Sequence, residues 1–155
     1  MHELHDAVML GDADAVRVAL EDGADVNDRD VADRTPLMYA AADGNQTIAE
    51  MLIDHGCEVN AYDRAGSTAL HAASQQQHVE LVRLLLQAGA FINAVDKDGN
   101  TPLFKAVFYS EGRGEVIELL LSSGADRNIR NNSGVSALSL AFTIANFDVR
   151  RFFGS

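Results

Sequence analysis

The sequence predicts an all-α solenoid in which pairs of short helices stack side by side. The first observation is a repeat: Thr35, Thr68, Thr101 and Ser136 open four copies of one pattern, at spacings of 33, 33 and 35 residues. The second observation is that every full copy holds two helix-like segments, and the third is a glycine that ends the second segment. Such a period is typical of repeat architectures, because one copy alone cannot bury its apolar helix.

The repeats divide the whole chain of 155 residues into one predicted domain. A copy upstream of Thr35 matches the pattern without its Thr-Pro opening, and the last copy is cut short, which suits a C-terminal cap. The expected copies are residues 4–34, 35–67, 68–100 and 101–135, followed by the partial copy 136–155.

The first helix of a copy begins at a threonine or serine that caps its N-terminus. Pro36 and Pro102 follow directly, at the first helical position, where the missing N–H costs nothing. Small residues such as Ala40 and Ala41 then allow a neighbouring helix to approach closely. A short turn reverses the chain, and in several copies that turn contains a glycine.

The second helix carries the apolar residues, and we expect Leu20, Leu52, Leu85 and Leu120 in the core. Gly23, Gly56, Gly89 and Gly124 end these helices, at a position where φ is usually positive. A turn-rich, extended segment such as "AYDRAGS" leads to the next copy.

The segments "TPLMYAAADGNQTIAEMLIDHGCEVN", "TALHAASQQQHVELVRLLLQAGAFIN" and "TPLFKAVFYSEGRGEVIELLLSSGADRN" resemble ankyrin repeats. The resemblance covers nearly the whole chain. It implies a curved stack of helix pairs with β-turn fingers projecting to one side, and hydrogen-bonding roles for His5 and His71. It also implies a non-catalytic module that binds another protein through a concave surface of fingers and first helices.

Partner-binding positions transfer from this resemblance to the finger segments and to the ends of the first helices. Among the positions that transfer are the finger residues Ala32, Ala65, Ser67 and Asn100 and the helix-end residue Ala42. The expected partner-binding residues are Arg29, Val31, Arg34, Asp43, Tyr62, Arg64, Gln75, Gln76, Val95, Lys97, Asp98, Phe108 and Tyr109.

The net charge of −11 lies almost entirely in the first 67 residues. An acidic surface attracts cationic partners and repels nucleic acid and acidic membranes, although plain solubility also explains it. The ending "NNSGVSALSLAFTIANFDVRRFF" resembles the last repeat of small bacterial ankyrin proteins, some of which are immunity proteins against secreted toxins. These features predict an inhibitor of a basic toxin or enzyme; the alternative is an adaptor that bridges two proteins without inhibiting either.

The remaining sequence features favour a monomeric cytoplasmic protein without catalytic activity. Cys57 is the single cysteine, and neither a signal peptide nor a long apolar run is visible. The five histidines and the aspartates of "DVNDRDVAD" match no metal-ligand spacing. We therefore expect no cofactor, no metal and no catalytic residue.

The stretch "FKAVFYSEGRGEVIELLL" departs from the pattern by two extra residues after two aromatic residues, Phe108 and Tyr109. Gly112 and Gly114 are expected to let the longer turn bend. One interpretation places an aromatic side chain in the neighbouring repeat. The other makes the pair an exposed aromatic anchor on the binding surface.

Overall fold

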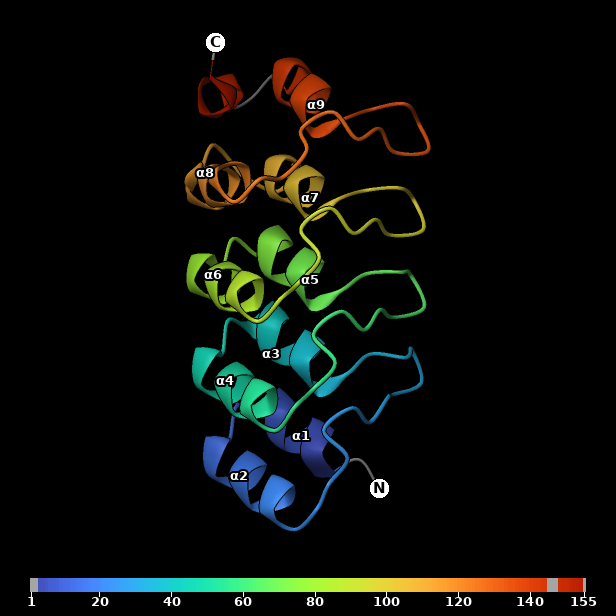
Figure 1. Cartoon of the computed structure of the whole chain (residues 1–155), viewed down its shortest axis with the longest axis vertical. Helices are drawn as coiled ribbons and strands as arrows, with labels where there is room; N and C mark the ends of the chain where they lie inside the picture. Colours follow the sequence, from blue (N-terminus) through green and yellow to red (C-terminus); the bar gives the residue numbers. More distant parts are fainter. Residues whose placement is uncertain (1–2, 145–147, 155) are drawn as a thin grey trace.

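The computed structural model describes residues 3–144 and 148–154, so part of the partial copy predicted at 136–155 lies outside the described residues. All regular secondary-structure elements of the described residues are helices, and the only β pairing among them consists of isolated bridges. The helices form two parallel rows (Figure 1). The inner row consists of α1 (Glu3–Met9), α3 (Pro36–Asp43), α5 (Ala69–Gln75), α7 (Pro102–Phe108) and α9 (Ala137–Thr143).

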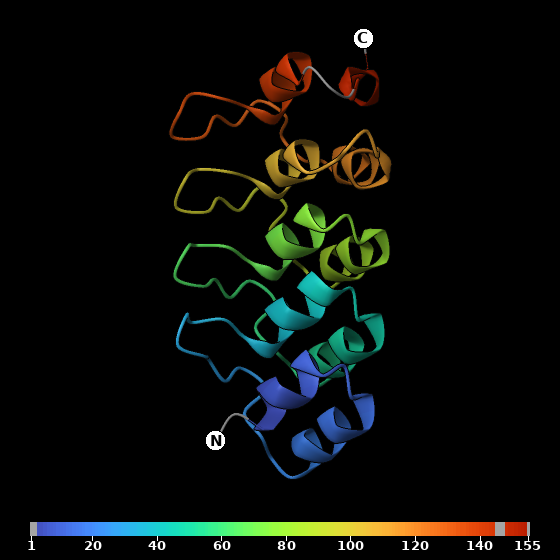
Figure 2. The same cartoon turned by 180° about the vertical axis from the view of Figure 1, so that it is seen from behind.

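The outer row packs against the inner row, and the fingers project from the opposite side of the inner row (Figures 1 and 2). This layout confirms the predicted solenoid of about four repeats. The outer row consists of α2 (Ala13–Glu21), α4 (Gln46–Asp54), α6 (Val79–Gln87), α8 (Glu115–Ser122) and the 3₁₀ helix η1 (Arg150–Phe153).

The inner helices begin where the sequence predicts. The Thr68 and Thr101 hydroxyls accept hydrogen bonds from the amides of His71 and Phe104, and Ser136 caps α9 in the same way. Thr35 makes no such side-chain bond, although Pro36 follows it at the first helical position. Each cap fixes the point at which an extended finger turns into a helix.

Histidines of the inner row bind backbone carbonyls that directly precede the next inner helix. The Nε2–H of His71 donates to the carbonyl of Asn100 at 2.9 Å, and His5 contacts the carbonyl of Arg34 at 3.0 Å in the same manner. Burial lowers the pKa of His71, so this imidazole is neutral at pH 7. The hydrogen-bonding role predicted for both residues is confirmed.

The core runs continuously between the two rows. Leu52, Leu85 and Leu120 are fully buried, and Leu20 is 7% exposed, so the predicted core positions are confirmed. The four glycines after the outer helices have positive φ angles between 77° and 96°, as predicted. The α6 helix packs against α5 of its own repeat and also contacts α4 on one side and α8 on the other, so neighbouring repeats help to cover its apolar face.

Replacing Leu85 by alanine is expected to lower the free energy of unfolding by about 2–5 kcal/mol, because the substitution leaves a cavity in the middle of the stack. Urea unfolding of the two proteins measures the change. Leu10→Ala is the matched control, since Leu10 is 82% exposed and its truncation opens no cavity. A Leu85→Ala loss no larger than that of the control would contradict the assignment of Leu85 to the core.

Candidate functional site

The fingers are β-hairpins whose two sides carry different residues. In the second finger, Tyr62 pairs with Thr68 in an isolated antiparallel bridge, and the Asp63 amide donates to the carbonyl of Ser67. Side chains alternate across an extended hairpin, so Tyr62 lies on one side and Asp63 with Ser67 on the other. We call the side of Asp63 the groove face and the side of Tyr62 the loop face.

The groove face contains a hollow between the second finger and the inner row. Its volume is about 280 Å³. Arg34 and Asp43 belong to the predicted binding set, whereas Met38, Tyr39 and Ala72 were not foreseen as site residues. The lining residues are Arg34, Met38, Tyr39, Ala42, Asp43, Asp63, Ser67, Thr68 and Ala72.

The ends of the inner helices continue this face along the stack. Asp43 ends α3, Gln75 ends α5 and Gln76 caps it. Gln75 is half-buried, and both Asp43 and Gln76 are exposed. Phe108 and Tyr109 occupy the corresponding place at the end of α7. The predicted helix-end residues are therefore aligned on one face.

The aromatic pair of the fourth repeat lies outside the core. Phe108 is 57% exposed and Tyr109 is 41% exposed. Phe108 stacks on the half-buried Phe104 with ring centroids 6.3 Å apart. The rings of Phe108 and Tyr109 pack edge-on, with their centroids 4.9 Å apart. Three aromatic rings thus form one exposed cluster, which favours the anchor interpretation over burial in a neighbouring repeat.

The lengthened turn after this pair bends differently from the prediction. Glu111 and Gly112 adopt positive φ angles of 50° and 85°, which reverse the chain. Gly114 instead has an ordinary φ of −115° and caps α8. A Cβ atom at Gly114 would collide with the ring of Phe152 as it is placed here, so packing against Phe152, and not the bend, favours glycine at this position.

The loop face carries a second hollow, of about 410 Å³, between the second and third fingers. Tyr62, Val95 and Lys97, all from the predicted set, line it. Phe91 also lines it and is 67% exposed, although the sequence analysis did not single it out. The signal was available: Asp25, Glu58 and Asp126 hold the equivalent place in the other copies.

The tips of the fingers are linked to each other through the backbone. The amide of Arg64 donates to the carbonyl of Ala32, and the amide of Lys97 donates to the carbonyl of Ala65. Next along the stack, the amide of Asn132 donates to the carbonyl of Asp98. Val31, Arg64, Lys97 and Asp98 therefore present exposed side chains from a connected row.

Two of the predicted arginines also hold neighbouring fingers together. The Arg29 guanidinium donates to the carbonyl of Tyr62 at 3.0 Å. The Nε of Arg64 contacts a carboxylate oxygen of Asp33 at 3.3 Å. Because these contacts join the first finger to the second, substitutions at either arginine would change the finger structure as well as the binding surface.

Asp30 organises the first finger. Its carboxylate accepts hydrogen bonds from the amides of Ala32 and Arg34, from the Arg34 Nε at 3.0 Å and from the Tyr39 hydroxyl at 2.6 Å. Burial acts to raise the pKa of Asp30, but these hydrogen bonds outweigh it and hold the pKa well below its ordinary value. Asp30 is therefore structural, because it holds the turn of the first finger together.

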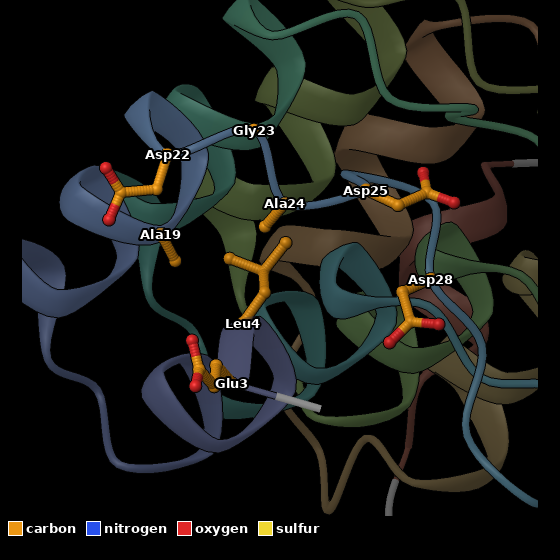
Figure 3. Close-up of a pocket in the computed structure, with 8 residues that line it drawn as sticks. All are labelled: Glu3, Leu4, Ala19, Asp22, Gly23, Ala24, Asp25 and Asp28. Atoms are coloured by element: carbon orange, nitrogen blue, oxygen red, sulfur yellow. The ribbon is translucent and has the colours of Figure 1, made fainter. Parts of the chain in front are cut away.

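The acidic first repeat forms a shallow hollow of about 490 Å³ at the N-terminal end of the stack. Figure 3 shows Leu4, Ala19 and Ala24 at its centre, with carboxylates spread around them. Asp28 is held by His5, with 3.4 Å between the imidazole Nδ1 and the carboxylate. Within residues 3–144 and 148–154, no group of three potential ligands is close enough to bind a metal ion. The hollow thus contributes negative potential without a metal-binding geometry.

Cys57 is half-buried, and burial raises the pKa of its thiol to about 11. The thiol is protonated at pH 7 and is a poor nucleophile, as expected of a small packed side chain. Among the described helices, none is both long enough and apolar enough to span a bilayer.

Comparison with known proteins agrees with this geometry. A family model of three ankyrin repeats matches residues 4–96 and 62–131, so the chain belongs to the ankyrin-repeat family. Members of this family bind other proteins, and the match points to a non-catalytic binding module.

A segment of 49 residues is 43% identical to human protein phosphatase 1 regulatory subunit 27, and it covers 32% of this chain. The same alignment covers 32% of that protein's length. The relationship thus concerns a local run of repeats.

Removing the Tyr39 hydroxyl with Tyr39→Phe is expected to cost about 1–2 kcal/mol of unfolding free energy at neutral pH, because a charged carboxylate loses a hydrogen bond. The folded-state pKa of Asp30 is depressed, so its stabilisation is complete above the unfolded-state pKa and is lost as the pH falls. The difference between the two proteins should therefore shrink below about pH 4.

Urea unfolding at pH 7, 4 and 3 measures this trend. Tyr109→Phe is the control, since the Tyr109 hydroxyl has no hydrogen-bond partner in the described part of the chain. A Tyr39→Phe cost that stays constant from pH 7 to pH 3 would disprove the role assigned to Asp30.

Proposed function

We propose that the groove face binds a cationic protein and that the chain inhibits this partner by covering its functional surface. The observation that carries the proposal is the combination of exposed aromatic rings with carboxylates on one face. Phe108 and Tyr109 supply apolar contact area, and Asp43 lies at the corresponding helix end two repeats away. Aromatic residues dominate interface energetics, and complementary charge accelerates association.

A toxin immunity protein is the most concrete form of this proposal. The resemblance of residues 131–153 to the last repeat of small bacterial immunity proteins supports it, as does the acidic first half of the chain. The human relative is, by its name, a regulatory subunit of an enzyme. Inhibition of an enzyme by an ankyrin stack would be a relation of the same kind. In this proposal the chain acts in the cytoplasm as a monomer.

A second candidate is an adaptor that bridges two proteins, and the loop face favours it. Tyr62, Phe91 and Val95 expose between 51% and 67% of their surface around one hollow, on the opposite side of the fingers from Asp63. Exposed apolar side chains gathered in this way mark interaction sites. An adaptor would use both faces at once.

Affinity capture followed by mass spectrometry identifies the partner, and an activity assay of that partner with increasing amounts of the chain separates the two candidates. Stoichiometric loss of the partner's activity supports inhibition. A ternary complex that keeps the partner active supports the adaptor. A neighbouring gene for a secreted toxin would supply the partner to assay first.

The double substitution Phe108→Ala with Tyr109→Ala is expected to weaken binding of the captured partner by about 2 kcal/mol or more, because both rings are exposed and available as contacts. Its melting temperature should change little, since neither ring is in the core. Calorimetric titration and a thermal melt measure the two effects. Lower stability with unchanged affinity would remove the aromatic cluster from the binding surface.

A test of charge steering must replace carboxylates that have no structural role in a finger. Asp28, Asp30 and Asp33 contact His5, Tyr39 and Arg64, so their substitution would alter the structure. Asp6 and Asp43 are exposed on the inner row, and neither side chain makes a hydrogen bond or an ion pair within the described part of the chain. They are the better choice for testing steering.

Asp6→Asn with Asp43→Asn is expected to slow association with the captured partner more than it speeds dissociation. The control, Glu21→Gln with Asp54→Asn, removes the same charge from the outer row. Stopped-flow mixing at about 50 mM and about 300 mM salt measures the on-rates, since screening grows over this range. An on-rate that responds neither to salt nor to the inner-row substitutions would exclude steering.

A further inference from the structure

Three fingers are closed by an aspartate that uses its two oxygens differently. Oδ1 of Asp30, Asp63 and Asp96 each accepts two amide hydrogen bonds from its own turn, at 2.8–3.0 Å. Only one of the two carboxylate oxygens is used to hold the turn. The second oxygen, Oδ2, remains available to a donor outside the turn.

In two of the three repeats a side chain nine residues later supplies that donor. The Tyr39 hydroxyl donates to Oδ2 of Asp30 at 2.6 Å. The Lys105 ammonium lies 3.3 Å from Oδ2 of Asp96, and both of these side chains are largely buried, at 19% and 6% exposure. Inner-helix residues thus complete the finger carboxylates, once with a neutral donor and once with a cation.

The remaining finger, that of Asp63, lacks this side chain. Ala72 stands nine residues after Asp63 and has no donor. Oδ2 of Asp63 has no hydrogen-bond or ion-pair partner among the residues that the structure describes. Asp63 and Ala72 instead line the groove-face hollow of about 280 Å³. The space that Tyr39 and Lys105 fill in the adjacent repeats is open here.

The charges around the hollow favour a cation. Arg34 lines it but is already engaged, with its Nε 3.0 Å from Asp30 and its guanidinium 4.9 Å from the centre of the Tyr39 ring. The carboxylates of Asp43 and Asp63 carry the remaining charge of the lining. Met38, Ala42 and Ala72 provide apolar walls, which suit the aliphatic stem of a long basic side chain.

We propose that this hollow is a slot for a lysine or arginine side chain of the bound partner, whose cationic head pairs with Oδ2 of Asp63. The pair of Lys105 with Asp96 is the internal example of the contact, formed within one chain. The proposal rests on the groove face being the binding surface. It adds the chemistry of one contact and the residue that makes it.

The peptide acetyl-Gly-Lys-Gly-amide probes the slot without the natural partner. Carbon-detected NMR follows the side-chain carboxyl of Asp63 during the titration, and the norleucine peptide of the same shape controls for apolar contact. A saturable Asp63 shift with the lysine peptide alone is expected. Ala72→Lys should abolish it by filling the slot, and Asp63→Asn should abolish binding while its amide oxygen still accepts the turn hydrogen bonds.

Lys105→Ala provides the matched gain of binding, because it opens an equivalent space beside Asp96. In that variant the lysine peptide should also shift the carboxyl of Asp96 and raise the melting temperature. Binding at Asp96 in Lys105→Ala with no saturable shift at Asp63 in the unmodified chain would overturn the proposal. Equal shifts at Asp63 and at the exposed Asp54 would overturn it too, since they indicate unspecific attraction.

Affinity measurements with the captured partner distinguish a wrong slot from a wrong proposed function. Ala72→Lys should weaken its binding at least about tenfold, as expected for loss of a close charge pair. If Ala72→Lys leaves affinity unchanged while Phe108→Ala with Tyr109→Ala lowers it, the groove face binds the partner and the slot is wrong. If neither variant changes affinity, the groove face itself is not the binding surface.

Discussion

The structure depends on burial that no single repeat can achieve. Both rows contribute large buried side chains, and α6 is covered by α5 of its own repeat and by α4 and α8 on either side. Leu52, Leu85 and Leu120 are fully buried in the stacked copies. This requirement sets the 33-residue period, since each copy must present the same face to its neighbour. The fingers and the groove are consequences of that stack.

Once the stack exists, polar contacts between copies define its surface. His71 reaches the carbonyl of Asn100 at the end of its own copy, directly before the Thr101 that caps the next inner helix, and the finger tips of adjacent copies exchange backbone hydrogen bonds. These contacts hold the fingers at fixed spacing. Recognition can therefore rely on individual side chains, because the backbone that carries them is already ordered and binding has little conformational entropy to overcome.

The period, the helix caps and the glycine exits could all be predicted from the sequence, because each depends on residues close together in the chain. The expected binding positions came from the family resemblance, which did not predict that they divide between two faces. Tyr62 and Asp43 belong to opposite sides of the fingers, which only the pairing of the hairpin reveals. Gly114 was misinterpreted because its constraint comes from Phe152, which is remote in sequence. The open carboxylate at Asp63 required a comparison of three repeats in space.

The hydrogen bonds between finger tips have a consequence for how such a chain can change. An insertion in one finger would displace an amide or a carbonyl that the neighbouring finger needs, so the damage would spread along the stack. The turn between α7 and α8 belongs to no such ladder, because its backbone hydrogen bonds stay within residues 105–118 of the same repeat. Two extra residues are found in that turn, whereas the first three fingers keep their length and differ in side chains alone. Changes in length thus occur in the turn between the helices of a repeat, and changes in side-chain chemistry occur in the fingers.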